Sequence, residues 1–111
     1  MIRVGDIKLS LEQVANAKEI LITDIREVRE YVDGKRTDNI IGYAYEVAAP
    51  KNKYEKFSIK VEEKSPVITA EELEAKGGVA KATANDFVGS FYHRGDDYVF
   101  TAKASKVVLL W

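Results

Sequence analysis

The chain lacks cysteine and has only one histidine among its 111 residues. Disulfides, thiolate metal sites and thiol chemistry are therefore excluded, and one chain cannot build a multi-histidine metal site. The sequence also lacks an apolar run of about 18 residues, the length that a membrane-spanning helix needs. Residues 1–10 lack the apolar core of a signal peptide. These absences predict a cytoplasmic protein that has no membrane segment, metal or cofactor.

The length predicts a single domain over residues 1–111, long enough to bury a core without cross-links. Basic and acidic residues nearly balance, with a net charge of −1. That sum neither favours nor opposes nucleic-acid binding, because binding depends on where the charges lie.

Alternating apolar and polar residues predict three strands in the first half of the chain. The first predicted strand is Ile20–Val32. Its apolar residues also recur at helical spacing, but β-branched residues dominate and favour a strand. A bulge near Asp24 explains why the alternation breaks there. A polar turn follows over Asp33–Asp38, and the second strand covers Asn39–Ala48. A short turn over Pro50–Asn52 leads to the third strand, Tyr54–Glu62.

Two capping boxes predict short helices. The pattern Ser-x-x-Gln from Ser10 starts one helix around residues 10–17. The pattern Thr-x-x-Glu starts another over Thr69–Lys76, which two glycines end. The second helix therefore separates the third strand from the strands that follow.

The C-terminal part returns to strands. Asp86–His93 and Tyr98–Ala104 flank a four-residue hairpin loop, residues 94–97, in which Gly95 can adopt positive φ. Lys106–Trp111 continues the last strand or adds another.

Three strands, a short helix and further strands are the order of elements in an oligonucleotide/oligosaccharide-binding (OB) barrel. We therefore predict a mainly β fold, a small, closed or nearly closed OB-like β-barrel of five to six strands. The short helix between strands 3 and 4 caps one end. Such barrels bind ligands on the second and third strands and in the loops that join strands 1 to 2 and 4 to 5.

Basic and aromatic residues gather at these predicted binding surfaces. Cations that follow phosphates and rings that stack on bases are typical of single-strand binders. The predicted nucleic-acid-binding residues are Lys35, Arg36, Lys51, Lys53, Tyr54, Lys56, Lys60, Tyr92 and Arg94. The charged residues of the segment 62–74, by contrast, are acidic except for one lysine. The plainer interpretation of Lys56 and Lys60 is that they are solvated or protect a strand edge from aggregation.

Two further tyrosines, Tyr43 and Tyr45, share a strand face with Ile41 and Val47, so we assign them to the core.

Catalytic interpretations are weaker. His93 lies near Asp96 and Asp97 in the sequence, but a lone histidine at a strand end is far more often structural or solvated. The adhesion-like tripeptide that begins at Arg94 has the residues that a hairpin turn selects. The chain has neither a nucleophile elbow nor a Gly-rich phosphate loop before a helix. We therefore predict that the protein is not an enzyme.

The stretch from Thr23 to Val61 resembles the small helicase processivity factors of integrative and conjugative elements of Gram-positive bacteria. The resemblance rests on the segments DGKRTD, GYAYEV, APKN and YEKFSIKV, and extends loosely over Phe91 to Val108. It implies a barrel related to single-strand-binding folds. It also implies that the protein helps a host-type helicase to unwind the element's DNA during transfer and rolling-circle replication, with single-stranded DNA and a relaxase as further partners.

The leading hypothesis is thus an accessory DNA-binding protein of a mobile genetic element, which holds single-stranded DNA and assists a helicase. Its main rival is a protein interaction or scaffold module of a phage or mobile element that binds no nucleic acid. A carbohydrate-binding barrel fits less well, because its site would need exposed aromatic platforms without so many lysines.

Overall fold

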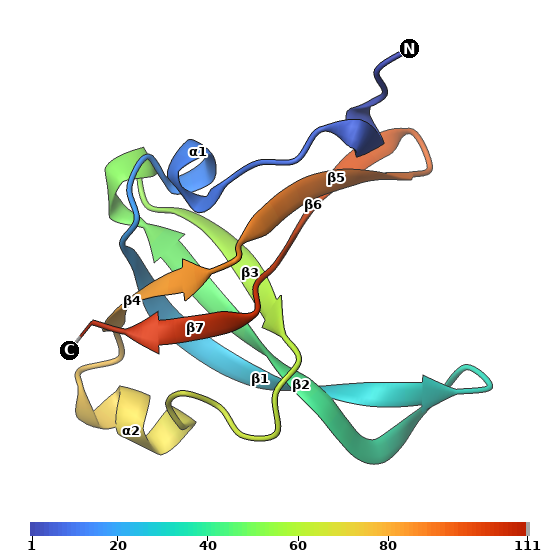
Figure 1. Ribbon diagram of the computed structural model, residues 1–111. Helices are drawn as coiled ribbons and strands as arrows, with labels where there is room; N and C mark the ends of the chain where they lie inside the picture. The colour runs from blue at the N-terminus through green and yellow to red at the C-terminus, as the bar shows by residue number, and fades with distance from the viewer. Residues whose placement is uncertain (111) are drawn as a thin grey trace.

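The structure is a computed structural model that describes residues 1–110 (Figure 1). It is mainly β. The short helical elements are η1 (Val4–Asp6), α1 (Leu11–Ala15), η2 (Pro50–Asn52) and α2 (Ala70–Ala75). The strands are β1 (Ile20–Val32), β2 (Lys35–Ala49), β3 (Glu55–Val61), β4 (Ala80–Asn85), β5 (Val88–Arg94), β6 (Asp97–Lys103) and β7 (Lys106–Leu109). None of the helices described is long and apolar enough to cross a membrane.

All seven strands belong to one sheet with the order β5-β6-β3-β2-β1-β4-β7. Neighbouring strands are antiparallel except β3 and β6, which run parallel. Within residues 1–110 the edge strands β5 and β7 are not paired with each other, so the sheet is not closed into a barrel. The predicted mainly β class and the helix between the third and fourth strands are confirmed. The sheet has seven strands rather than the predicted five to six, and the part of the chain described does not close it into the predicted barrel.

The additional strands arise because both arms of the C-terminal hairpin are interrupted. Asp86–Phe87 separates β4 from β5, and Ala104–Ser105 separates β6 from β7. Because β5 pairs with β6 and β4 pairs with β7, the four strands form one bent hairpin (Figure 1). At the bend, Asp86 has a positive φ of 54°, and the Ser105 hydroxyl donates to its carboxylate at 2.6 Å.

The first strand of this hairpin, β4, was missed by sequence reasoning. Half of its residues are alanine, which has a low strand propensity. Its pairing with β1 and β7 provides the stabilisation that local propensity does not.

The prediction for β1 is confirmed in its bounds and in its irregularity. β1 covers Ile20–Val32, and its pairing with β2 shifts register between Ile22 and Asp24, where the bulge was expected.

Both predicted polar loops between strands are longer than the turns in the structure. The loop predicted to extend to Asp38 is only the turn Asp33–Gly34, where both residues have positive φ, and β2 begins directly after it. Two such residues are what a tight hairpin turn requires. Likewise Arg94 pairs with Asp97, which leaves two residues between β5 and β6. β7 adds a strand to the sheet, while Trp111, the end of the predicted segment, lies outside the described residues.

Both capping boxes are present, although the helices are shorter than predicted. Ser10 Oγ accepts from the Gln13 N–H, and the Gln13 side chain accepts from the Ser10 N–H. Thr69 and Glu72 make the same reciprocal pair of hydrogen bonds at the start of α2.

The core lies on the inward face of the sheet, under α1, α2 and the segment that joins β3 to α2. Tyr45 is completely buried there, as predicted, and Tyr43 packs against the same cluster. The Tyr45 hydroxyl donates to Glu63 Oε2 at 2.7 Å and accepts from the Val67 N–H at 2.8 Å. Burial raises the pKa of Tyr45 far above its usual value, so this phenol stays protonated and acts as a donor. The hydroxyl thereby ties the joining segment to the sheet.

The outer half of the β1–β2 hairpin, residues 29–41, projects from the sheet as a two-stranded arm (Figure 1). β2 pairs with β3 only from Tyr43 onward, and β1 pairs with β4 only over Ile20–Ile22. The arm begins at Gly42, where the end of β3 crosses so close that any Cβ would overlap the Val61 carbonyl oxygen. Glycine is therefore required at this crossing.

Candidate nucleic-acid interface

Cationic residues form a row across the outward face of four strands. Arg26 of β1 pairs with Ala44 of β2, Ala44 pairs with Lys60 of β3, and Lys60 pairs with Lys103 of β6. Paired residues on neighbouring strands lie side by side on the sheet. Three cationic positions therefore lie at one level, with the small Ala44 between two of them. We call the outward face around this row the Lys60 face.

The next level of the same face holds an acidic residue that is already paired. Glu46 of β2 lies opposite Ser58 of β3, whose hydroxyl donates to the Glu46 carboxylate at 2.6 Å. Arg26 Nε lies 3.3 Å from the same carboxylate, yet the Arg26 side chain remains 61% exposed. A guanidinium has five N–H donors, so Arg26 retains donors for an external acceptor.

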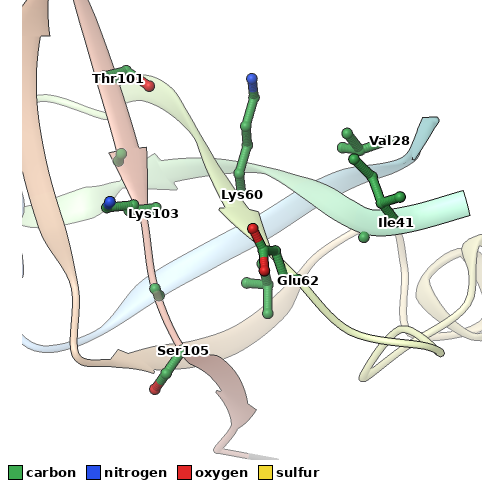
Figure 2. A pocket seen from close by; sticks show the side chains of 11 residues that line it. Val28, Ile41, Lys60, Glu62, Thr101, Lys103 and Ser105 are labelled. Atoms are coloured by element: carbon green, nitrogen blue, oxygen red, sulfur yellow. The ribbon is translucent and has the colours of Figure 1, made fainter. Parts of the chain in front are cut away.

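Three hollows open on the Lys60 face, and Lys60 lines all of them. The outer groove has a volume of about 690 Å³ and is lined by residues that include Arg26, Glu46, Lys56, Ser58, Tyr92 and Thr101. The arm hollow has a volume of about 290 Å³ and is lined by residues that include Arg26, Val28, Arg29, Tyr31 and Arg36. The apolar hollow has a volume of about 590 Å³ and lies between the base of the arm and β6 (Figure 2).

The outer groove follows the line where β3 and β6 separate. These strands pair only at Ile59 and Lys60 of β3. Beside that pairing, the rings of Phe57 and Phe100 meet edge to face, with centroids 5.9 Å apart, and both line the groove. Lys56 and Lys60 line it from β3, while the half-exposed Tyr92 lines it from β5. This combination offers cations to phosphates and a ring to a base.

Only some of the predicted binding residues come together on the Lys60 face. Lys56, Lys60 and Tyr92 line the outer groove, and Arg36 lines the arm hollow. The others are exposed in three separate turns and line none of the three hollows: Lys35 at the tip of the arm, Lys51, Lys53 and Tyr54 between β2 and β3, and Arg94 at the β5–β6 turn.

Tyr54 lies before the third strand, so the alternation used to assign it to the cationic side of that strand does not apply to it. β3 begins at Glu55. Lys53 and Tyr54 both have positive φ, and the Tyr54 N–H donates to the Ala49 carbonyl oxygen at 2.9 Å. Strand alternation therefore does not determine where the exposed Tyr54 ring points.

Sequence reasoning missed Arg26 and Lys103. The bulge between Ile22 and Asp24 shifts the alternation of β1, so the face of Arg26 cannot be counted from the start of the strand. Pairing of Ile25 with the buried Tyr45 sets the alternation after the bulge and leaves Arg26 on the outward face. Lys103 joins the row only through the parallel pairing of β6 with β3, for which the sequence gives no local signal.

The part of the chain that the structure describes contains no cluster of three or more histidine, cysteine or acidic side chains arranged to hold a metal ion. The His93 ring packs against Tyr98, with centroids 5.1 Å apart. Neither observation assigns a chemical role to His93.

Comparison with known proteins gives no relative: no family model, curated protein or solved structure matches this chain.

Proposed function

We propose that the protein is an accessory DNA-binding factor of a mobile genetic element, which holds single-stranded DNA on the Lys60 face and assists a helicase during conjugation and replication. The observation that carries this proposal is the row of Arg26, Lys60 and Lys103 beside a groove that also contains an exposed tyrosine. The helicase is proposed as a partner because Thr23–Val61 resembles helicase processivity factors.

The strand pairings support an OB-like architecture for this protein. If each arm of the bent hairpin counts as one strand, the elements are three strands, a helix and two strands. β3 then pairs with one arm through β6, and β1 pairs with the other arm through β4. OB barrels are partly open five-stranded barrels that bind oligonucleotides on the second and third strands. Lys56 and Lys60 lie on the third strand here.

The mechanism that we infer uses electrostatic attraction and stacking, with no bond made or broken. Along β3, Lys56 and Lys60 are four residues apart, which corresponds to roughly 13 Å of extended chain. Phosphates would follow these ammonium groups and Arg26, while a base stacks on Tyr92. A protein that holds the displaced strand in this way disfavours its reannealing behind a helicase.

Salt-dependent binding tests the proposal. We expect a fluorescent single-stranded oligonucleotide to bind with weak to moderate affinity, and log Kobs to fall against log salt with a slope of about −3 to −4. About five cations on the Lys60 face can each neutralise one phosphate, and each contributes about −0.7 to the slope for a single strand. Fluorescence anisotropy between 50 and 200 mM salt, a range over which this slope lowers the affinity by roughly a hundredfold, measures the slope. No binding at the lowest salt would refute the proposal.

The rival function, an interaction module without nucleic-acid binding, is favoured by one observation. The projecting arm exposes four large apolar side chains to solvent, Tyr31, Val32, Ile40 and Ile41. A pull-down from host lysate with and without nuclease separates the two functions, because a partner bound through DNA is lost after nuclease treatment.

Two exposed tyrosines provide a matched test of stacking. We expect Tyr92→Ala to weaken single-strand binding by roughly 1–3 kcal/mol, the contribution of one base stacked on an aromatic ring. Tyr54→Ala removes a ring that is also exposed but lies outside the outer groove, and should leave affinity nearly unchanged. Anisotropy titrations of both variants measure the difference. A larger loss from Tyr54→Ala would move the stacking site to the β2–β3 turn.

A further inference from the structure

The apolar hollow is the part of the Lys60 face that phosphate binding does not explain. Figure 2 shows Val28 and Ile41 next to each other on one wall, and Thr101 and Lys103 of β6 and Ser105, which follows β6, on the other. Lys60 and Glu62 lie between these walls. The remaining lining is mostly small or apolar, and includes Gly42 and Val61.

The hollow is built on closely packed backbone at the base of the arm. The absence of a side chain at Gly42 lets the end of β3 lie against β2 there. On the opposite wall, the Ala104 N–H donates to the Lys60 carbonyl oxygen at 3.1 Å and holds the end of β6 against β3. Its volume of about 590 Å³ is within the range of small-molecule sites, roughly 300–1,000 Å³. A group of small-molecule size with apolar faces can therefore enter it.

The charged residues that line the hollow are Lys60, Lys103 and the acidic Glu62, so cations outnumber anions there and favour an anionic flank on that group. Lys60 and Lys103 are exposed and occupy neighbouring register positions. Neither forms an ion pair with another residue of the described part of the chain. Lys60 also lines the outer groove, so the hollow continues directly from the surface where phosphates are proposed to bind.

A nucleotide within a strand meets both requirements, because its base has apolar faces and a phosphate lies on either side of it. We propose that the apolar hollow receives one unstacked nucleobase of the bound single strand, while Lys60 and Lys103 contact the phosphates that flank it. This inference rests on the proposed function. It specifies single-stranded rather than duplex DNA as the substrate, because a base that is paired in a duplex would first have to leave its stack.

Adjacent isoleucines on β2 provide the test. Ile41 lines the hollow and is 46% exposed, whereas Ile40 is 36% exposed and does not line it. The probes are a 12-nucleotide oligothymidylate and an abasic oligonucleotide of the same length. We expect Ile41→Ala to weaken oligothymidylate binding by about tenfold, within the range of one base contact. Binding of the abasic probe should not change, and Ile40→Ala should leave both affinities unchanged.

Other results distinguish the two proposals. Equal losses from Ile41→Ala and Ile40→Ala, or equal affinity of the natural chain for both probes, would overturn the base pocket and leave phosphate binding on the Lys60 face intact. Failure of the natural chain to bind either probe would overturn the proposed function as well.

Photocrosslinking provides a measurement that does not depend on how the variants fold. In the natural chain, an oligonucleotide with one 4-thiothymidine should crosslink to peptides that contain Ile41 or Glu62. Crosslinks confined to other peptides would overturn the pocket.

Discussion

Reversing the charge of Lys56 and Lys60 together, to Glu, is expected to abolish single-strand binding, a loss of roughly a hundredfold or more at low salt. Both side chains line the outer groove, and two attractive contacts with phosphate become two repulsive ones. The fold should persist, because exposed substitutions usually change stability by no more than about 0.5 kcal/mol each. Anisotropy titration measures the binding, and circular dichroism during heating measures the thermal midpoint.

The matched control is the same double reversal at Lys51 and Lys53. These lysines are also exposed but lie at the β2–β3 turn, outside the three hollows. The control should retain most of the affinity. An equal loss in both double variants would mean that total charge, rather than the Lys60 face, governs binding.

The largest effect on stability is expected at Tyr45. Tyr45→Phe removes the hydroxyl that bonds to Glu63 and to the Val67 N–H, which should lower the free energy of unfolding by about 1–3 kcal/mol, because those partners lose their bonds. Tyr45→Ala also empties a core position and should cost about 3–5 kcal/mol. Urea unfolding followed by circular dichroism measures both losses.

Tyr43 provides the control for that measurement. It packs against the same cluster, but within the described residues its hydroxyl makes no hydrogen bond. Tyr43→Phe should therefore change the free energy of unfolding by no more than about 0.5 kcal/mol. Similar losses from both phenylalanine variants would show that the link to the segment after β3 is not what stabilises the fold.

The stabilising effect of the Tyr45 hydroxyl should also depend on pH. Its pKa is raised in the folded protein, so this contribution is fully present below the ordinary tyrosine pKa of 10.0. Above that pH the unfolded chain loses the proton while the folded chain keeps it, which favours unfolding. The difference in stability between the natural chain and Tyr45→Phe should therefore shrink as the pH rises above 10.0.

The elements of the fold that could be predicted are those whose signals lie close together in the sequence. The two capping boxes, the bulge before Asp24 and the burial of Tyr45 depend on residues close together in the sequence, and the structure has all of them. By contrast, half of the residues of β4 are alanine, and this strand is stabilised by strands that are distant in the sequence. The bend at Asp86 and Ser105 likewise joins residues from two arms of a hairpin.

The candidate site could be predicted only in part for the same reason. Lys56 and Lys60 share a strand face by simple alternation, so sequence reasoning brought them together. Arg26 and Lys103 join them only through strand pairing. The apolar hollow depends on the crossing at Gly42, which no sequence pattern indicates.

That crossing has a consequence for the search for relatives. A homologue that keeps the end of its third strand against the second needs glycine at the position of Gly42, since a Cβ there would overlap backbone. The tyrosine three positions later, Tyr45, ties the next chain segment to the same sheet. A profile that weights this glycine and tyrosine above the surface lysines is therefore expected to identify distant homologues whose overall sequences have diverged.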